Sequence, residues 1–203
     1  MVRKTKAEAE ATRESILDAA EQVFMERGVA RASLEEIARH AGVTRGAVYW
    51  HFKNKQDILD AMLERVRPPL GDMMEEADTT GDSLAYLKQL CQNALSDLAE
   101  DEQYARVYYI LFHRNESDQA LAKHRALADE GIAFITAILS QPDNQKRLRE
   151  GLSPEHAAYI LHTQMLGLFF DSLANPQRWH LADIAGTLLN TVFSGLLADS
   201  VKA

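Results

Sequence analysis

Hydrophobic residues recur along this chain with the spacing of amphipathic helices. Within residues 12–27, five of them form one helical stripe at offsets 0, 1, 4, 7 and 8: Ile16, Leu17, Ala20, Val23 and Phe24. Gly28 follows this stripe and predicts the end of the helix. No stretch alternates polar and apolar residues as a half-buried strand would, so the pattern predicts an all-α fold.

Two short helices are predicted next, joined by a tight turn. Ser33 and Glu36 have the spacing of a capping box, and the helical pattern that follows them ends at Gly42. Thr44 is the next predicted N-cap, and it precedes apolar residues that lie four apart on one helical face. A capped helix, a glycine-containing turn and a second capped helix form the outline of a helix-turn-helix.

A fourth helix is predicted to begin at Asn54 and to continue to about Arg67. Pro68 and Pro69 interrupt it, because proline lacks the backbone donor and clashes with the preceding turn. We therefore predict a domain boundary here, with residues 1–67 as the helix-turn-helix domain and residues 68–203 as a larger second domain.

The second domain is predicted to be helical as well. The segment GDMMEEADTTGDS, directly after the prolines, is polar and rich in turn-forming residues, and we expect no helix in it. Helical patterns then resume at about 83–99, 102–115, 118–140, 154–174 and 180–199. Ser153 before Pro154 predicts the start of the fourth of these helices, and Asn175 before Pro176 predicts its end.

Charge is distributed unequally between the two predicted domains. The chain of 203 residues has a formal net charge of −8, yet residues 1–67 hold 12 lysines and arginines against 11 acids. Residues 39–55 contain no acid at all, and their basic residues are Arg39, Arg45, Lys53 and Lys55. We expect this face to suit phosphate. The basic arm at Arg3, Lys4 and Lys6 suits a duplex backbone or a minor groove, or it is a solubilising tail.

The predicted helix after Thr44 carries side chains suited to DNA recognition. A helix of about seven residues is roughly 10 Å long and fits a major groove about 12 Å wide. Arg45 has the planar fork that binds guanine, and Gly46 permits close approach to phosphate. Donors expected to bind backbone phosphates are Thr44, Tyr49, His51 and Lys55. Alternatively, Tyr49, Trp50 and His51 only pack between the neighbouring helices.

Three segments resemble the N-terminal DNA-binding domain of TetR-family transcriptional regulators. They are TRESILDAAEQVFMERGV, SLEEIARHAGVTRGAVYWHFKNK and KQDILDAM, and together they cover roughly the first 65 residues. The segments RKTKAEAEATR and GVTRGAVYWHFKNK are most similar to the AcrR-like branch, which represses multidrug efflux pump genes. The resemblance implies a palindromic operator bound by dimers. It also implies that eight residues lie at or beside DNA: Ser33, Thr44, Arg45, Gly46, Tyr49, Trp50, His51 and Lys55.

The last two predicted helices are apolar on more than one face, which requires a second buried surface. Gly167, Gly186 and Gly195 would allow close approach of a partner helix. We therefore predict a homodimer formed through these helices, as the resemblance also implies.

The middle helices are predicted to surround a cavity for a small hydrophobic effector. The segment YARVYYILFHR is rich in aromatic residues, and such residues line small-molecule pockets. Candidate lining residues are Cys91, Tyr108, Phe112, Met165, Phe169 and Asp171. Simple core packing is the alternative for each. Asp171 is either a partner for a cationic ligand or a partly exposed interface carboxylate.

Several classes of function are not expected. The chain has no nucleophile elbow, no glycine-rich phosphate loop, no HExxH motif and a single cysteine, so neither an enzyme nor a cofactor is predicted. No secretory signal or membrane span is expected, and a cytoplasmic protein is predicted. The predicted function is a repressor that a ligand releases from DNA through a shift of the fourth helix. A DNA-binding regulator or interaction module without an inducer is the alternative.

Overall fold

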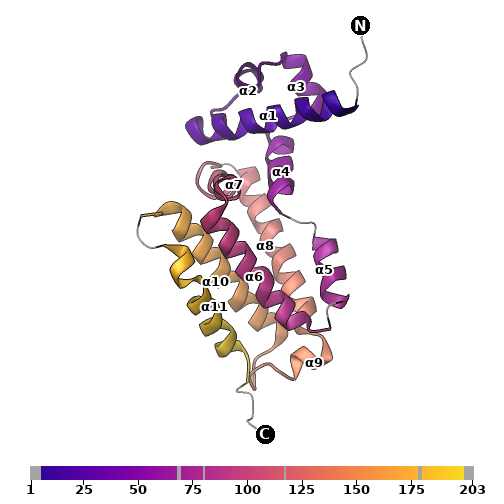
Figure 1. Ribbon diagram of the computed structural model, residues 1–203, viewed down its shortest axis with the longest axis vertical. Helices are drawn as coiled ribbons and strands as arrows, with labels where there is room; N and C mark the ends of the chain where they lie inside the picture. The colour runs from indigo at the N-terminus through magenta and orange to yellow at the C-terminus, as the bar shows by residue number, and fades with distance from the viewer. Residues whose placement is uncertain (1–5, 68–69, 80, 117, 178–179, 199–203) are drawn as a thin grey trace. The chain divides into compact units, whose positions relative to one another are not determined.

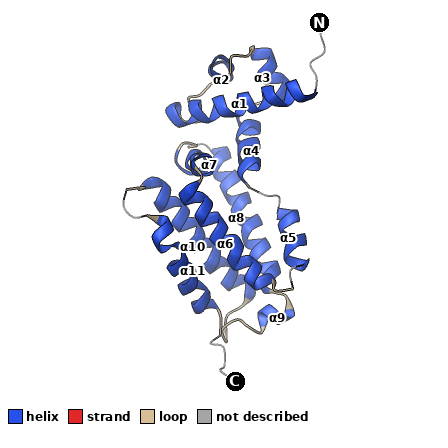
Figure 2. Cartoon of the chain, in the orientation of Figure 1, coloured by secondary structure: helices blue, strands red, loops and turns tan. Residues whose placement is uncertain are grey.

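The computed structural model describes residues 6–67, 70–79, 81–116, 118–177 and 180–198. Within these ranges the chain forms helices joined by short loops, and its strand-type pairing is limited to one isolated antiparallel bridge between Leu148 and Leu197 (Figures 1 and 2). The prediction of an all-α fold is confirmed.

The chain divides into two compact units. The N-terminal unit comprises Met1–Arg67 together with Arg106–Ala120, and the C-terminal unit comprises Pro68–Ala105 together with Leu121–Ala203. The predicted domains, 1–67 and 68–203, divide the chain at the same proline pair. Helix α7, Glu102–His113, has residues in both units. The grouping of residues 106–113 of this helix with the first 67 residues is a feature that the hydrophobic pattern did not indicate.

Four helices form most of the N-terminal unit: α1 (Lys6–Arg27), α2 (Leu34–His40), α3 (Arg45–His51) and α4 (Lys55–Val66). Helix α1 packs against α2, α3 and α4, and α2 also packs against α3 (Figure 1). The centre of this unit consists of apolar side chains that are at most 1% exposed, among them Ile16, Leu17, Phe24, Ile37, Val48, Ile58 and Met62. The predicted stripe of the first helix is therefore its buried face, although the helix begins at Lys6 and not near residue 12.

The predicted helix starts in this unit are confirmed. The Ser33 hydroxyl accepts a hydrogen bond from the Glu36 backbone at 3.1 Å, and the Glu36 carboxylate accepts one from the Ser33 backbone at 3.0 Å. The Ser33 hydroxyl also donates to the Glu36 carboxylate at 3.0 Å, and this hydrogen bond, together with the one from the Ser33 backbone, lowers the pKa of Glu36. The Thr44 hydroxyl caps α3 by accepting a hydrogen bond from the Ala47 backbone N–H at 3.1 Å. The Asn54 side-chain oxygen caps α4 by accepting one from the Asp57 backbone N–H at 2.9 Å. Gly42, with φ of +66°, makes the turn between α2 and α3.

The C-terminal unit contains five further helices besides the first residues of α7: α5 (Leu70–Thr79), α6 (Ser83–Glu100), α8 (Asp118–Leu139, with its first residues grouped in the other unit), α10 (Pro154–Ala174) and α11 (Leu181–Leu196). A single turn, α9 (Pro142–Gln145), follows α8. Helix α6 packs against α5, α10 and α11, and α10 also packs against α11. The bounds predicted from the sequence for the longer helices agree with these to within a few residues.

We predicted no helix in the segment directly after the prolines. This prediction is wrong, because α5 occupies residues 70–79. Ala77 is buried, while Met73 and Met74 are half-buried, so this helix has an apolar side that packs on α6. The Tyr86 hydroxyl on α6 donates a hydrogen bond to the Glu76 carboxylate at 3.0 Å. The many acids of the segment concealed this short stripe. The turn α9 was not predicted either.

Candidate functional site

Helix α3 has one buried side and one exposed side. Val48 is fully buried and Phe52, directly after the helix, is 3% exposed. On the other side Tyr49 is 46% exposed and Trp50 is 72% exposed, with Arg45 exposed one turn earlier. The alternative prediction, that Tyr49 and Trp50 only pack between neighbouring helices, is therefore wrong. The side chains of α3 that are not needed for the core face solvent.

Arg45 is held against Tyr49 on the exposed side of α3. The guanidinium Nη2 donates a hydrogen bond to the Tyr49 hydroxyl at 3.4 Å, and the guanidinium carbon lies 5.3 Å from the centre of the tyrosine ring. This hydrogen bond raises the pKa of Arg45 further, so the side chain is charged at any physiological pH. A guanidinium that stacks on a ring has fewer conformations to lose when it binds a base or a phosphate.

The remaining residues predicted to lie at DNA have different surroundings. The imidazole of His51 is half-buried, with its centre 4.4 Å from that of the Trp50 ring. A Cβ added to Gly46 would meet only the Thr44 hydroxyl oxygen, at 3.9 Å, so the fold itself does not require glycine there. Ser33 is exposed, and its hydroxyl is engaged in the capping box of α2. These DNA-binding assignments stay predictions.

Lys55, at the start of α4, has a structural role in the N-terminal unit. Its ammonium donates to the backbone carbonyls of Val29, Ala30 and Ala32, at 2.5 to 3.0 Å. All three N–H donors of this side chain thus have an acceptor within the unit. The sequence predicted a phosphate contact for Lys55 and did not indicate these carbonyls.

The basic face predicted over residues 39–55 is exposed at Arg39, Arg45 and Lys53. Of the basic arm, Lys6 begins α1, while Arg3 and Lys4 lie outside the described residues. The described part of this face combines exposed cationic side chains with the exposed rings of α3. This arrangement is typical of a surface that binds phosphate and base edges together.

The six predicted effector-binding residues divide between the two units. Tyr108 and Phe112 belong to the N-terminal unit, where their rings lie 5.9 Å apart on α7. The C-terminal unit contains the other four, Cys91, Met165, Phe169 and Asp171.

The four candidates of the C-terminal unit differ in burial. Cys91 and Phe169 are buried, and the Phe169 ring contacts that of Tyr104 at 6.1 Å between centres. Burial raises the pKa of the Cys91 thiol to about 12, so this thiol stays neutral and apolar. Met165 and Asp171 are half-buried, and the Asp171 carboxylate accepts a hydrogen bond from the Asn175 amide at 3.2 Å. The role of these residues in effector binding stays a prediction.

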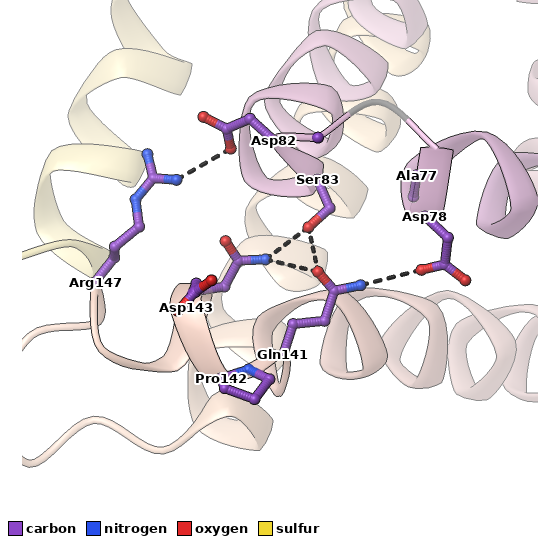
Figure 3. A pocket seen from close by; sticks show the side chains of 10 residues that line it. Ala77, Asp78, Asp82, Ser83, Gln141, Pro142, Asp143 and Arg147 are labelled. Atoms are coloured by element: carbon purple, nitrogen blue, oxygen red, sulfur yellow. Dashed lines mark hydrogen bonds and ion pairs between the residues drawn. The ribbon is translucent and has the colours of Figure 1, made fainter.

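A polar cavity of about 570 Å³ lies beside the start of α6, next to α9 (Figure 3). The Asn144 amide donates hydrogen bonds to the Ser83 hydroxyl at 2.8 Å and to the Ile138 carbonyl at 2.9 Å. The Ser83 hydroxyl also donates to the Gln141 side chain, and Arg147 forms an ion pair with Asp82 at 3.0 Å. These groups satisfy one another and tie α6 to the connection between α8 and α10. None of the six predicted effector residues lines this cavity.

Helix α10 exposes a row of large apolar side chains. Tyr159, Ile160, Leu166 and Phe170 are 59%, 42%, 40% and 51% exposed. A Cβ added to Gly167, Gly186 or Gly195 would meet no other described atom within 4 Å. Solvent-exposed rings and aliphatic chains in one row mark an interaction surface. Helix α10 therefore has an exposed apolar surface that a second protomer could bury, as predicted, while the exposed large apolar side chains among the described residues do not extend to α11.

The N-terminal unit defines the class of protein: its α2, four-residue turn and α3 form a helix-turn-helix with an exposed basic and aromatic second helix. Residues 16–62 match the family described as bacterial regulatory proteins, tetR family. Relatives of similar length match over nearly the entire chain. The chain belongs to the tetR family, and it is a transcriptional regulator and not an enzyme.

Two curated relatives illustrate the similarity. The chain is 35% identical over 205 residues to the HTH-type transcriptional repressor BepR of Brucella suis biovar 1 (strain 1330), with 98% of each chain covered. It is 36% identical over 187 residues to the HTH-type transcriptional regulator AcrR of Shigella flexneri, with 89% of this chain and 87% of the relative covered.

Solved structures of similar proteins share the complete fold. One is NalD, the secondary repressor of the MexAB-OprM multidrug efflux pump in Pseudomonas aeruginosa, with a TM-score of 0.88, 38% identity, and coverage of 96% of this chain and all of that chain. Another is SmeT in a complex with triclosan, with a TM-score of 0.84, 33% identity and 95% of each chain covered. In the described part of our chain, each helix is too short or too polar to cross a membrane.

Proposed function

We propose that this protein is a ligand-responsive transcriptional repressor that binds a palindromic operator as a homodimer. Small hydrophobic effectors release it, and it controls an efflux pump operon in the cytoplasm. The observation that carries this proposal is the exposed Arg45, Tyr49 and Trp50 face of α3 in a segment without acids. The similarity to NalD, named as a repressor of an efflux pump, supports the proposed target.

In the proposed complex, α3 of each protomer enters one major groove. Arg45 contacts a guanine edge, while Thr44, Tyr49 and His51 contact phosphates, and Ser33, Gly46, Trp50 and Lys55 lie beside them. Residues 1–67 form the DNA-binding domain, and residues 68–203 bind the effector and the second protomer. The two recognition helices bind half-sites separated by about 34–36 Å, one helical turn of DNA.

Induction is proposed to act through α4, which connects the DNA-binding domain to the second domain. A hydrophobic effector binds inside the second domain, residues 68–203, and α4 shifts so that the two recognition helices no longer fit adjacent grooves. SmeT, a protein similar to this one, has been solved with triclosan, which is a small apolar compound. Apolar and adaptable side chains such as Met165 and Phe169 suit ligands of that kind.

Triclosan is therefore expected to lower operator affinity by a factor of about 5 to 150, the usual range of allosteric coupling. Anisotropy titrations of labelled operator with and without saturating triclosan measure this factor. By thermodynamic reciprocity, saturating operator lowers triclosan affinity by the same factor, which calorimetry checks. Binding of triclosan with equal affinity to free and operator-bound protein would contradict the coupling and favour a regulator without this inducer.

The dimer is proposed to form through the exposed side of α10. Leu166→Glu places a charge in the centre of that row and is expected to convert the dimer into monomers at micromolar concentration, because a buried unpaired carboxylate opposes association. Gln164→Glu is the matched control, since Gln164 is exposed on α10 and lies outside the row of large apolar residues. Light scattering on the eluting protein measures both masses. A wild-type monomer, or a dimer in Leu166→Glu, contradicts this interface.

A further inference from the structure

The ammonium of Lys55 joins two segments that are distant in sequence. Its three acceptors, the carbonyls of Val29, Ala30 and Ala32, belong to the loop between α1 and α2, 23 to 26 residues earlier in the chain. Hydrogen bonds from an ionised donor are stronger than those between neutral groups. The side chain is half-buried, so solvent competes less for these contacts than at an exposed lysine.

The position of this contact relative to the helix-turn-helix is informative. The loop immediately precedes Ser33, the N-cap of α2, and Lys55 comes three residues after Phe52, the C-cap of α3. The whole of α2, the turn and α3 therefore lies between the two segments that the ammonium joins. A contact in this place fixes the start of α2 relative to the end of α3, and hence the angle at which α3 is presented.

The loop is also held on its other side. The Val29 backbone N–H donates to the Arg114 carbonyl at 2.8 Å, and the Arg114 guanidinium donates to the Glu26 carbonyl at 2.9 Å. Gly28, with φ of +77°, directs the chain into this position, where a Cβ would lie 3.4 Å from the Arg114 carbonyl oxygen. These contacts hold the loop at Glu26 and Val29, whereas Lys55 also reaches Ala30 and Ala32, within the three residues that precede the N-cap of α2. Loss of the ammonium is therefore expected to act on the side of the loop that leads into α2.

We propose that Lys55 is a positioning residue for operator binding, which sets the orientation of the helix-turn-helix through the loop carbonyls and does not neutralise a phosphate. The inference rests on the proposed operator binding. It assigns Lys55 an effect on specific recognition and none on the electrostatic, sequence-independent part of the affinity. These two parts of the affinity are separable, because phosphate contacts alone set the dependence of binding on salt.

Lys53 provides a matched control on the same surface. Its side chain is exposed, and its backbone N–H donates to the Asp57 carboxylate at 2.9 Å, an interaction that side-chain replacement retains. Lys53→Met and Lys55→Met therefore each remove one positive charge, at positions two residues apart. The Lys53 side chain faces solvent, whereas the Lys55 side chain binds the loop.

The experiment measures affinity for operator and for a random duplex at several salt concentrations. In Lys53→Met, loss of one phosphate contact per protomer is expected to reduce the slope of log K against log salt by about 1.8 per dimer, and to weaken both duplexes by a similar factor. In Lys55→Met the slope is expected to stay unchanged. Operator affinity falls about tenfold or more, as expected for loss of charge-assisted hydrogen bonds, while random-duplex affinity changes by less than about twofold.

Lys55→Arg keeps the charge and decides the question if Lys55→Met does not fold. A planar guanidinium serves a phosphate well but does not reproduce a compact ammonium that meets three converging carbonyls. We expect operator affinity to fall about tenfold with an unchanged slope. Retained affinity in this variant, or a reduced slope in Lys55→Met, would show a phosphate contact and overturn the inference.

Two further outcomes are distinguished by the same data. A lower unfolding temperature of Lys55→Met with unchanged operator affinity would show a role in stability alone and would also overturn the inference. Wild-type protein that does not prefer operator over random duplex would contradict the proposed function itself. The wild-type titration therefore precedes the variants, and it separates failure of operator binding from failure of the role of Lys55.

Discussion

Replacement of Arg45 by alanine is expected to lower operator affinity at least about 30-fold with little loss of stability. A bidentate contact to guanine contributes about 1–3 kcal/mol of discrimination, and a dimer bound to a palindrome makes two such contacts. Arg45 is exposed, and its described contacts are with Tyr49 on the same helix. Its removal is therefore expected to change the free energy of unfolding by less than about 0.5 kcal/mol.

Base substitution within the operator tests what Arg45 recognises. If Arg45 contacts a guanine, replacing that base pair symmetrically in both half-sites weakens the wild type but has almost no further effect on Arg45→Ala. Tyr49→Phe tests the hydrogen bond that holds Arg45 in place. This variant keeps the ring under the guanidinium and removes the hydroxyl acceptor. Equal losses for operator and random duplex in Arg45→Ala would instead show that Arg45 contacts only phosphate.

Replacement of Arg106 by alanine is expected to be the most destabilising single change in the N-terminal unit outside its apolar core. Glu21 of α1 is 5% exposed, and its carboxylate accepts a hydrogen bond and ion pair from Arg106 of α7. Without Arg106 this carboxylate is left buried and loses the ion pair that compensates its charge. The Arg106 side chain is 41% exposed, so screening reduces the loss below the usual value for a fully buried pair, to about 2–3 kcal/mol.

A second variant separates the buried charge from lost packing. Glu21→Gln in the Arg106→Ala background removes the unpaired charge and is expected to recover about half of the lost stability, since a neutral amide costs less to bury. Urea denaturation at one fixed protein concentration measures these differences, because dimer stability depends on concentration. Equal stability of Arg106→Ala and the wild type would show that the ion pair contributes nothing measurable.

The local features of the fold could be predicted from sequence because their causes are local. The capping box at Ser33, the N-caps at Thr44 and Asn54 and the glycine turn at Gly42 each depend on residues within four positions of one another. The same holds for the division of α3 into a buried and an exposed side, which follows from helical spacing. These predictions placed Arg45 and Tyr49 together on one helix face, and the structure shows that this face is exposed. That the face binds DNA stays a prediction.

Features that depend on distant partners could not be predicted in this way. The acceptors of Lys55 lie 23 to 26 residues away, and Arg106 is 85 residues from Glu21. An acid next to the apolar stripe of α1 was a signal that Glu21 needs a partner, but the pattern does not identify that partner. Helix α5 was missed because its short apolar side becomes meaningful only against α6.

Recognition of a specific operator by α3 is testable in one titration. Fluorescence anisotropy of a labelled duplex from the DNA upstream of the gene is measured against wild-type protein, with a random duplex of equal length at the same fixed salt concentration. We expect binding to the upstream duplex to be at least about 10³-fold tighter than to the random duplex, with one dimer per site. Equal affinity for the two duplexes would contradict it.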